Sequence, residues 1–180
     1  EYTSTQTFTV TVTNVNDAPV LATVDDVIFT EDGSSGSITL LATDPDIGDV
    51  LTFGITGGDN ISADLAGNDL TFTPDQDFNG SESFTVNVSD GDLSNSETFT
   101  VTVSAVNDAP VLATVSDTNF DEDGSGSISL DGLGSDVDGD DLTFSISDGS
   151  DITAFLSGSD VSFSAPANYN GSEEFSVSVS

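Results

Sequence analysis

Aspartate side chains gather in one stretch of the second half of the chain, Asp136-Val137-Asp138-Gly139-Asp140-Asp141. Carboxylates held together without a cation repel one another, whereas Ca²⁺ takes about six to eight oxygen ligands in a flexible geometry. The chain has 33 acidic residues and no lysine, arginine or histidine, so its formal net charge is −33. Because no cationic side chain can neutralise these carboxylates, the sequence favours calcium as their partner.

A second polar motif recurs along the chain. The hexapeptide Val106-Asn107-Asp108-Ala109-Pro110-Val111 repeats residues 15–20 letter for letter, and the offset from Asn16 to Asn107 is 91 residues. Proline has no backbone N–H, so it can begin a strand but not lie inside a central ladder. We interpret the hexapeptide as the joint between repeats, which fits two repeats in 180 residues.

Alternating apolar and polar residues dominate the segments between these joints, as in Phe84, Val86 and Val88. This period of two is typical of strands with one buried face, and no segment predicts a helix. In the first repeat the pattern predicts strands at 18–24, 26–30, 36–41, 50–56, 61–65, 69–73, 82–89 and 95–104. Short strands at this spacing predict an all-β fold of tandem immunoglobulin-like β-sandwiches, with about seven strands each.

The 91-residue period also predicts the domain organisation. Residues 1–16 are expected to form the last strand (G) of a preceding repeat plus a linker, residues 17–107 the first repeat, and residues 108–180 a second repeat without its own strand G. Phenylalanines that recur at this offset are expected to form the cores: Phe29 and Phe120, Phe53 and Phe144, Phe72 and Phe163, Phe84 and Phe175.

Strand order sorts the acidic loops by end of the sandwich. Glu31-Asp32, Asp75 and Asp77 are expected at the end of the first repeat where the chain leaves through Asn107-Asp108. The loop that begins at Asp136 is expected at the facing end of the second repeat. We therefore predict that these carboxylates converge on the joint, where calcium would hold them together.

Several of these motifs resemble calcium motifs of cadherin repeats: Glu31, Ala42-Thr43-Asp44-Pro45-Asp46, Ser89-Asp90-Gly91-Asp92 and the Val-Asn-Asp-Ala-Pro linker. The whole chain is similar to the cadherin-like tandem repeats of large bacterial surface adhesins. This resemblance implies calcium ligands at the central joint: Glu31, Asn107, Asp108, Asp136 and Asp138. It implies further ligands at an upstream joint: Asn16, Asp17, Asp44, Asp46 and Asp90. The second repeat departs from the pattern where Pro166-Ala167-Asn168 replaces Pro74-Asp75-Gln76-Asp77.

The resemblance implies a calcium-rigidified spacer at the cell surface or outside the cell, in a bacterial adhesin or fibre that supports adhesion, biofilm or matrix assembly. Its partners would be neighbouring copies, head to tail. The strong negative charge excludes nucleic acid and direct contact with an anionic membrane. A carbohydrate- or self-binding module is the alternative. We do not expect an enzyme, because without His, Cys or Lys only carboxylates could readily act as base or nucleophile.

The first 13 residues lead to a separate expectation. The segment Thr7–Val12 is identical to Thr98–Val103, the strand that closes the first repeat. We therefore expect residues 1–13 to pack as strand G on the second repeat of a preceding copy. The two copies would either belong to one continuous polypeptide or be separate chains that share a strand.

Overall fold

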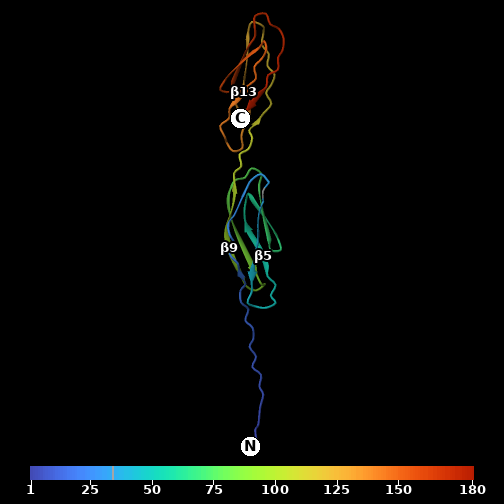
Figure 1. Ribbon diagram of the computed structural model, residues 1–180, viewed down its shortest axis with the longest axis vertical. Coiled ribbons are helices and arrows are strands. Elements are labelled where there is room, and N and C mark those ends of the chain that lie inside the picture. The colour runs from blue at the N-terminus through green and yellow to red at the C-terminus, as the bar shows by residue number, and fades with distance from the viewer. Residues whose placement is uncertain (34) are drawn as a thin grey trace. The chain divides into compact units, whose positions relative to one another are not determined.

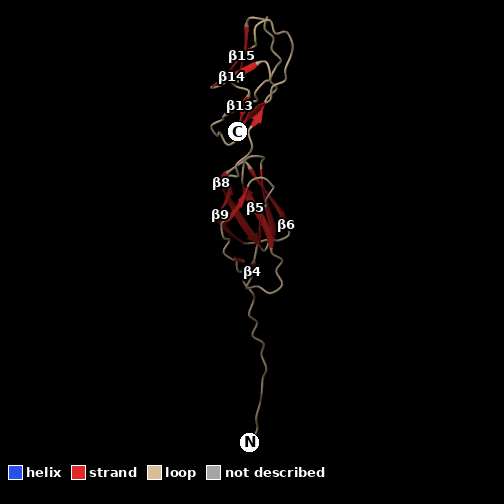
Figure 2. Cartoon of the chain, turned by 45° about the horizontal axis from the view of Figure 1, so that its top comes forward, coloured by secondary structure: helices blue, strands red, loops and turns tan. Residues whose placement is uncertain are grey.

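A computed structural model describes residues 1–33 and 35–180, which divide into two compact units, Glu1–Val106 and Asn107–Ser180. Each unit is built from antiparallel hairpins and short strands, and within those residues there is no helix (Figure 2). Likewise, no helix in this part of the chain is long and apolar enough to cross a membrane. The predicted all-β sandwich fold is confirmed.

The first unit packs a four-stranded sheet, in the order β2-β9-β8-β5, against a three-stranded sheet, in the order β3-β7-β6. Figure 1 labels β9 and β5 of the larger sheet. A small ladder of β1 and β4 completes the unit. The strands are β1 (Val20–Leu21), β2 (Val27–Thr30), β3 (Gly36–Thr39), β4 (Ala42–Thr43), β5 (Thr52–Gly57), β6 (Ile61–Ala66), β7 (Asp69–Pro74), β8 (Gly80–Ser89) and β9 (Ser94–Ser104).

Strand β9 is the centre of the larger sheet. It pairs antiparallel with β8 over ten residues and parallel with β2 from Val27 to Thr30. Its inward side chains Phe99, Val101 and Val103 are buried. The ring of Phe99 packs 5.8 Å from that of Phe72, which in turn lies 5.1 Å from that of Phe84, so one aromatic cluster joins the two sheets.

The second unit contains a three-stranded sheet, in the order β11-β15-β14, and two-stranded ladders of β13 with β16 and of β10 with β12. Its strands are β10 (Val111–Leu112), β11 (Ser125–Ser129), β12 (Gly134–Ser135), β13 (Phe144–Ile146), β14 (Thr153–Ser157), β15 (Asp160–Ser164) and β16 (Val177–Val179). The aromatic pair recurs, because the rings of Phe163 and Phe175 lie 5.2 Å apart. The buried core is smaller and comprises Leu130, Val161 and Phe163.

The strands predicted for the first repeat are all present, with ends shifted by a few residues and with 18–24 reduced to Val20–Leu21. Of the phenylalanines expected in the cores, Phe72, Phe84 and Phe163 are buried, and the other five are partly buried. Residues 1–13 form no strand, and their side chains are exposed. The domain boundaries at 17–107 and 108–180, and the assignment of 1–16 to a preceding repeat, stay predictions.

Candidate metal centre

The loop after β4 brings three carboxylates together in the first unit. Oxygen atoms of Asp44, Asp46 and Asp49 all lie within 4.8 Å of one another. The loop is polar and interrupted by Pro45 and Gly48, of which Gly48 has a φ of 107° that suits glycine. The sequence therefore favours an irregular loop here, and the turn aims its acidic side chains at a common point.

Backbone N–H groups fix the orientation of these carboxylates. The Asp46 amide donates to Asp44 Oδ1 at 2.8 Å, which is the local turn typical of an aspartate two residues earlier. Asp46 in turn accepts from the Asp17 amide at 2.7 Å and from Asn14 Nδ2 at 2.7 Å. These bonds connect the linker before β1 to the loop after β4.

The turn between β8 and β9 contributes a fourth carboxylate. Asp90 Oδ1 accepts hydrogen bonds from the amides of Asp92 and Leu93, and its Oδ2 accepts from Asn16 Nδ2 at 3.0 Å. The structure thus gathers at one end of the first unit the five residues that the resemblance implies as ligands of the upstream joint: Asn16, Asp17, Asp44, Asp46 and Asp90.

The carboxylates at this end of the first unit differ in the direction in which their pKa values are shifted. Hydrogen bonds from the Asp17 amide and from Asn14 lower the pKa of Asp46, and those from the Leu93 and Asp92 amides lower the pKa of Asp90. The pKa of Asp49 is raised, first by desolvation and then by the negative charges of Asp44, Asp46, Asp90 and Asp92. The site is therefore short of positive charge.

One carboxylate oxygen of this cluster has no hydrogen-bond donor among the described residues. Asp44 Oδ2 is buried, and no described residue donates a hydrogen bond to it. A buried carboxylate oxygen without a partner is costly, so the position calls for a cation or an ordered water. The surrounding donors are oxygens, which hard cations such as Ca²⁺ prefer, and this donor set fits calcium.

The second unit repeats the same local arrangement. The Asp108 amide donates to Asp138 Oδ2 at 2.7 Å, and the Asp138 amide donates to Asp136 Oδ1 at 2.9 Å. Asn107 lies beside them and donates from Nδ2 to the Asp108 carbonyl oxygen at 3.0 Å. The structure therefore brings together Asn107, Asp108, Asp136 and Asp138 within this unit.

Glu31 lies at the other end of the first unit, where it is 2% exposed. Its Oε1 accepts a hydrogen bond from the Val106 amide at 2.8 Å, while its Oε2 is buried without a donor among the described residues. Because only one oxygen of this buried carboxylate accepts a hydrogen bond, a cation would stabilise Glu31 as it would Asp44. Its placement with Asn107, Asp108, Asp136 and Asp138 in one site stays a prediction of the sequence.

Asp75 and Asp77 line a pocket of about 240 Å³ with Asp32 in the first unit. Asp32 and Asp77 have φ values of 65° and 57°, and the equivalent Asp123 and Asn168 both have 61°. Asparagine and aspartate are the side chains that best tolerate this left-handed conformation. The change to Asn168 in the second repeat therefore keeps the turn and loses only the charge.

Sequence reasoning missed two groups of residues here. Asn14 and Asp49 belong to the acidic end of the first unit, and the position of Asp49 three residues after Asp46 was the available signal. Glu82 accepts hydrogen bonds from the amides of Asp59, Asn60 and Ile61, which anchors the connection between β5 and β6.

Glu173 does the same for the amides of Ser150, Asp151 and Ile152 in the second unit. Desolvation opposes ionisation of Glu82, but the hydrogen bonds outweigh it and lower its pKa. The recurrence of this glutamate at the 91-residue offset was the signal for a structural role.

Two sandwich units with acidic loops define the chain as a tandem immunoglobulin-like protein. Residues 16–104 and 107–180 each match the bacterial Ig domain family, so the chain belongs to that family. A comparison with curated proteins gave no match.

Similar solved structures include an endo-fucoidan hydrolase of glycoside hydrolase family 107, at 22% identity and a TM-score of 0.42 over 84% of this chain and 25% of that one. Extracellular cadherin domains 3–6 of protocadherin gamma B2 match at 18% identity and a TM-score of 0.52, over 84% and 39% of the two chains. The titin domains Z1Z2 in complex with telethonin match at 10% identity and a TM-score of 0.41, over 92% and 95%.

This chain thus spans about a quarter of the length of the hydrolase. The likeness to the protocadherin domains shows the sandwich fold. Together with the family match, it confirms the resemblance to cadherin-like immunoglobulin repeats.

Proposed function

We propose that the chain is a spacer of an extracellular or cell-surface adhesin or fibre, whose sandwich repeats are stiffened by calcium. The observation that supports this is the acidic end of each unit. In both units a linker aspartate donates its amide to the second carboxylate of an Asp-x-Asp loop, at 2.7 Å. Bonds that orient several carboxylates toward one point are useful to a protein that holds a cation there.

Particular residues would hold the ion in each unit. In the first they are Asn16, Asp17, Asp44, Asp46 and Asp90, and in the second they are Asn107, Asp108, Asp136 and Asp138. Glu31 would bind calcium at the opposite end of the first unit. When bound, Ca²⁺ would supply the positive charge that the side chains of this chain lack, and it would tie the linker to the loops of the sandwich.

A spacer also accounts for the repetition of the site. A catalytic centre works at one place, whereas these loops recur in successive domains, which favours a scaffold whose partners are further repeats, head to tail. The net charge of −33 opposes binding to nucleic acid or to anionic membranes. The proposed role is therefore mechanical support of adhesion or matrix assembly rather than catalysis.

Calorimetric titration of the calcium-depleted chain tests this proposal. The double variant Asp44→Asn/Asp46→Asn should weaken calcium binding in the first unit by roughly tenfold or more, because two charges close to a divalent cation are lost. The control is Asp25→Asn/Asp64→Asn, which removes the same charge from exposed side chains of the same unit. The control should change affinity by no more than about twofold, since exposed, distant charges are screened by salt. Absence of calcium binding, or equal weakening by both variants, would contradict the proposal.

A further inference from the structure

A carboxylate closes the connection between β5 and β6, where the chain crosses from the larger sheet of the first unit to the smaller one. Glu82, on β8, accepts hydrogen bonds from four N–H groups: the amides of Asp59, Asn60 and Ile61 at 2.9, 2.9 and 3.1 Å, and Asn60 Nδ2 at 2.9 Å. We propose that Glu82 is a latch, which holds this connection closed while it is ionised and releases it when it is protonated, independently of calcium.

The four donors leave no room for a proton on this carboxylate. Asp59 and Ile61 donate to Oε2, and both groups of Asn60 donate to Oε1. An ionised carboxylate offers about four lone-pair sites, so all of them are occupied. Protonation turns one site into an O–H donor that faces an N–H donor, and at least one hydrogen bond is then lost. The closed connection therefore requires the ionised form of Glu82.

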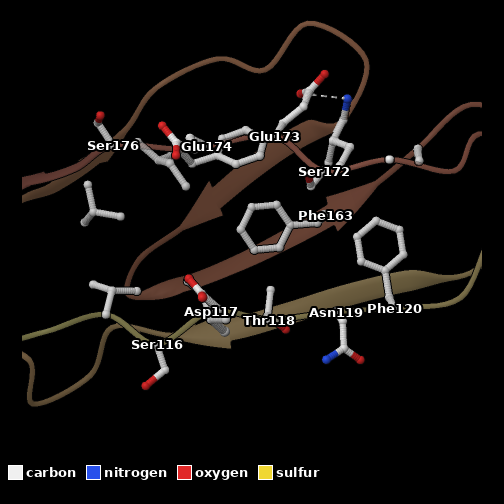
Figure 3. Close-up of a pocket in the computed structure, with 18 of the residues that line it drawn as sticks. Ser116, Asp117, Thr118, Asn119, Phe120, Phe163, Ser172, Glu173, Glu174 and Ser176 are labelled. Atoms are coloured by element: carbon white, nitrogen blue, oxygen red, sulfur yellow. Dashed lines mark hydrogen bonds between the residues drawn. The ribbon is translucent and has the colours of Figure 1, made fainter.

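The second unit builds the same arrangement 91 residues later. Glu173 accepts from the Ser150 and Ile152 amides with Oε2, both at 3.1 Å, and from the Asp151 amide with Oε1 at 2.7 Å. Figure 3 draws Glu173 with its hydrogen bond from Ile152 as a dashed line. Because the three amides are directed at the same oxygens in both units, the arrangement is a built feature of the repeat.

The closed connection covers part of the buried core. Gly58 has a φ of 82°, and a Cβ atom added to it would lie 2.7 Å from the ring of Phe84, so the backbone lies directly on that ring. Phe84 is buried, as is Ile61, the first residue of β6. Among the described residues, β6 pairs only with β7, so no second strand holds its start. Release of the latch should therefore expose this edge of the core.

Hydrogen bonds rather than charges keep Glu82 ionised. The elements around it carry only negative side chains: Asp59 in the connection, Asp64 on β6, Asp69 on β7, Asp75 and Asp77 in the loop after β7, and Glu97 on β9. Desolvation raises the pKa of Glu82, but the bonds from Asn60, Asp59 and Ile61 outweigh it and lower the pKa below its ordinary value of 4.5. The latch therefore stabilises the fold fully above about pH 4.5 and is lost as the pH falls through the folded-state pKa.

Hydrogen exchange at pH 7, measured by NMR, tests the latch. Glu82→Gln keeps the shape of the side chain but offers one acceptor oxygen to four donors, so the three amides of the connection should exchange faster by roughly tenfold or more. The matched control is Glu97→Gln, whose oxygen can still accept the bond that Glu97 accepts from the Val24 amide at 3.1 Å. In the control, exchange of the same amides should stay within about twofold. Equal effects of the two variants, or no effect of Glu82→Gln, would overturn the proposal.

Titration of the natural chain toward acid tests the role of the proton. The carboxyl carbon resonance of Glu82 should titrate with a midpoint below 4.5, and the three amide resonances should shift with the same midpoint. Asn60→Ala removes one of the four donors and frees a lone-pair site, so it should raise this midpoint, and it provides the test if Glu82→Gln does not fold. A midpoint at or above 4.5 in the natural chain, amide resonances that do not follow it, or an unchanged midpoint in Asn60→Ala would contradict the latch.

Discussion

Asp46 and Asp49 lie in the same loop, yet their pKa values move in opposite directions. Asp46 accepts hydrogen bonds from the Asp17 amide and Asn14, which lower its pKa. Asp49 is partly desolvated and lies near four other negative charges, which raise its pKa. The local environment therefore stabilises the charged form of Asp46, whereas the charged form of Asp49 would be stabilised by a bound cation.

A single substitution at Asp49 should separate these effects. Because folding raises the pKa of Asp49 above its ordinary value of 3.8, its ionisation destabilises the calcium-free fold, and this cost is fully present at neutral pH. Asp49→Asn should therefore raise the melting temperature without calcium at pH 7, and the gain should vanish at pH values low enough to protonate the carboxyl. With saturating calcium, the variant should lose part of the stabilisation that calcium gives.

The control for this measurement is Asp64→Asn, at an exposed aspartate of the same unit whose side chain makes no hydrogen bond with the described residues. It should leave both melting temperatures nearly unchanged. A lower melting temperature for calcium-free Asp49→Asn than for the natural chain would show that the carboxylate is already stabilised without a cation.

Sequence reasoning located the acidic loops because Asp-x-Asp and Asn-Asp recur beside predicted strand ends. It could not locate Asn14, whose Nδ2 reaches Asp46 across 32 residues of sequence. It also missed Glu82, because a glutamate in an alternating strand is indistinguishable from a solvated charge until its three amide donors are known. Side-chain hydrogen bonds between distant segments depend on the exact packing of the loops.

At the level of elements, the two copies of the sequence Thr-Phe-Thr-Val-Thr-Val show how far pattern determines structure. Alternation predicted a strand in both places, and only β9 forms one. A strand needs hydrogen-bonding neighbours, so the intrinsic preference of residues 7–12 is not sufficient alone. The same reason explains why the segment after Thr118 lacks the strand that its equivalent, β2, forms beside β9.

The duplicated hexapeptide offers a matched pair of substitutions. Phe99→Ala should destabilise the first unit by about 3–5 kcal/mol, the usual cost of removing a buried aromatic ring. Phe8→Ala deletes the same side chain from the same local sequence and should leave the stability of that unit nearly unchanged. Denaturant unfolding followed by circular dichroism in dilute solution measures both. Comparable losses would mean that residues 7–12 already pack against the first unit.

Most strands of the first unit were predictable because one buried face imposes a period of two. The ends were less predictable. The segment predicted at 18–24 keeps only Val20–Leu21 as a strand, because its short pairing partner is Ala42–Thr43. Strand length is decided by the partner as well as by the segment itself.

For the whole molecule, the charge of −33 is the dominant constraint. Self-repulsion of this size disfavours compact states at low salt and is screened within about 8 Å at physiological ionic strength. The buried core of each unit consists of apolar residues and includes no carboxylate of the acidic loops. Calcium is therefore expected to act on the linkers and loop ends more than on the folding of the sandwiches.

Small-angle X-ray scattering of the chain with calcium and with chelator tests the central claim most directly. A dilute sample of the natural chain at physiological ionic strength is appropriate, because association between copies then contributes little to the scattering. The account predicts that chelation makes the chain more flexible and changes its maximum dimension, while circular dichroism shows that the sandwiches stay folded. An unchanged maximum dimension and flexibility on calcium removal would contradict a calcium-stiffened spacer.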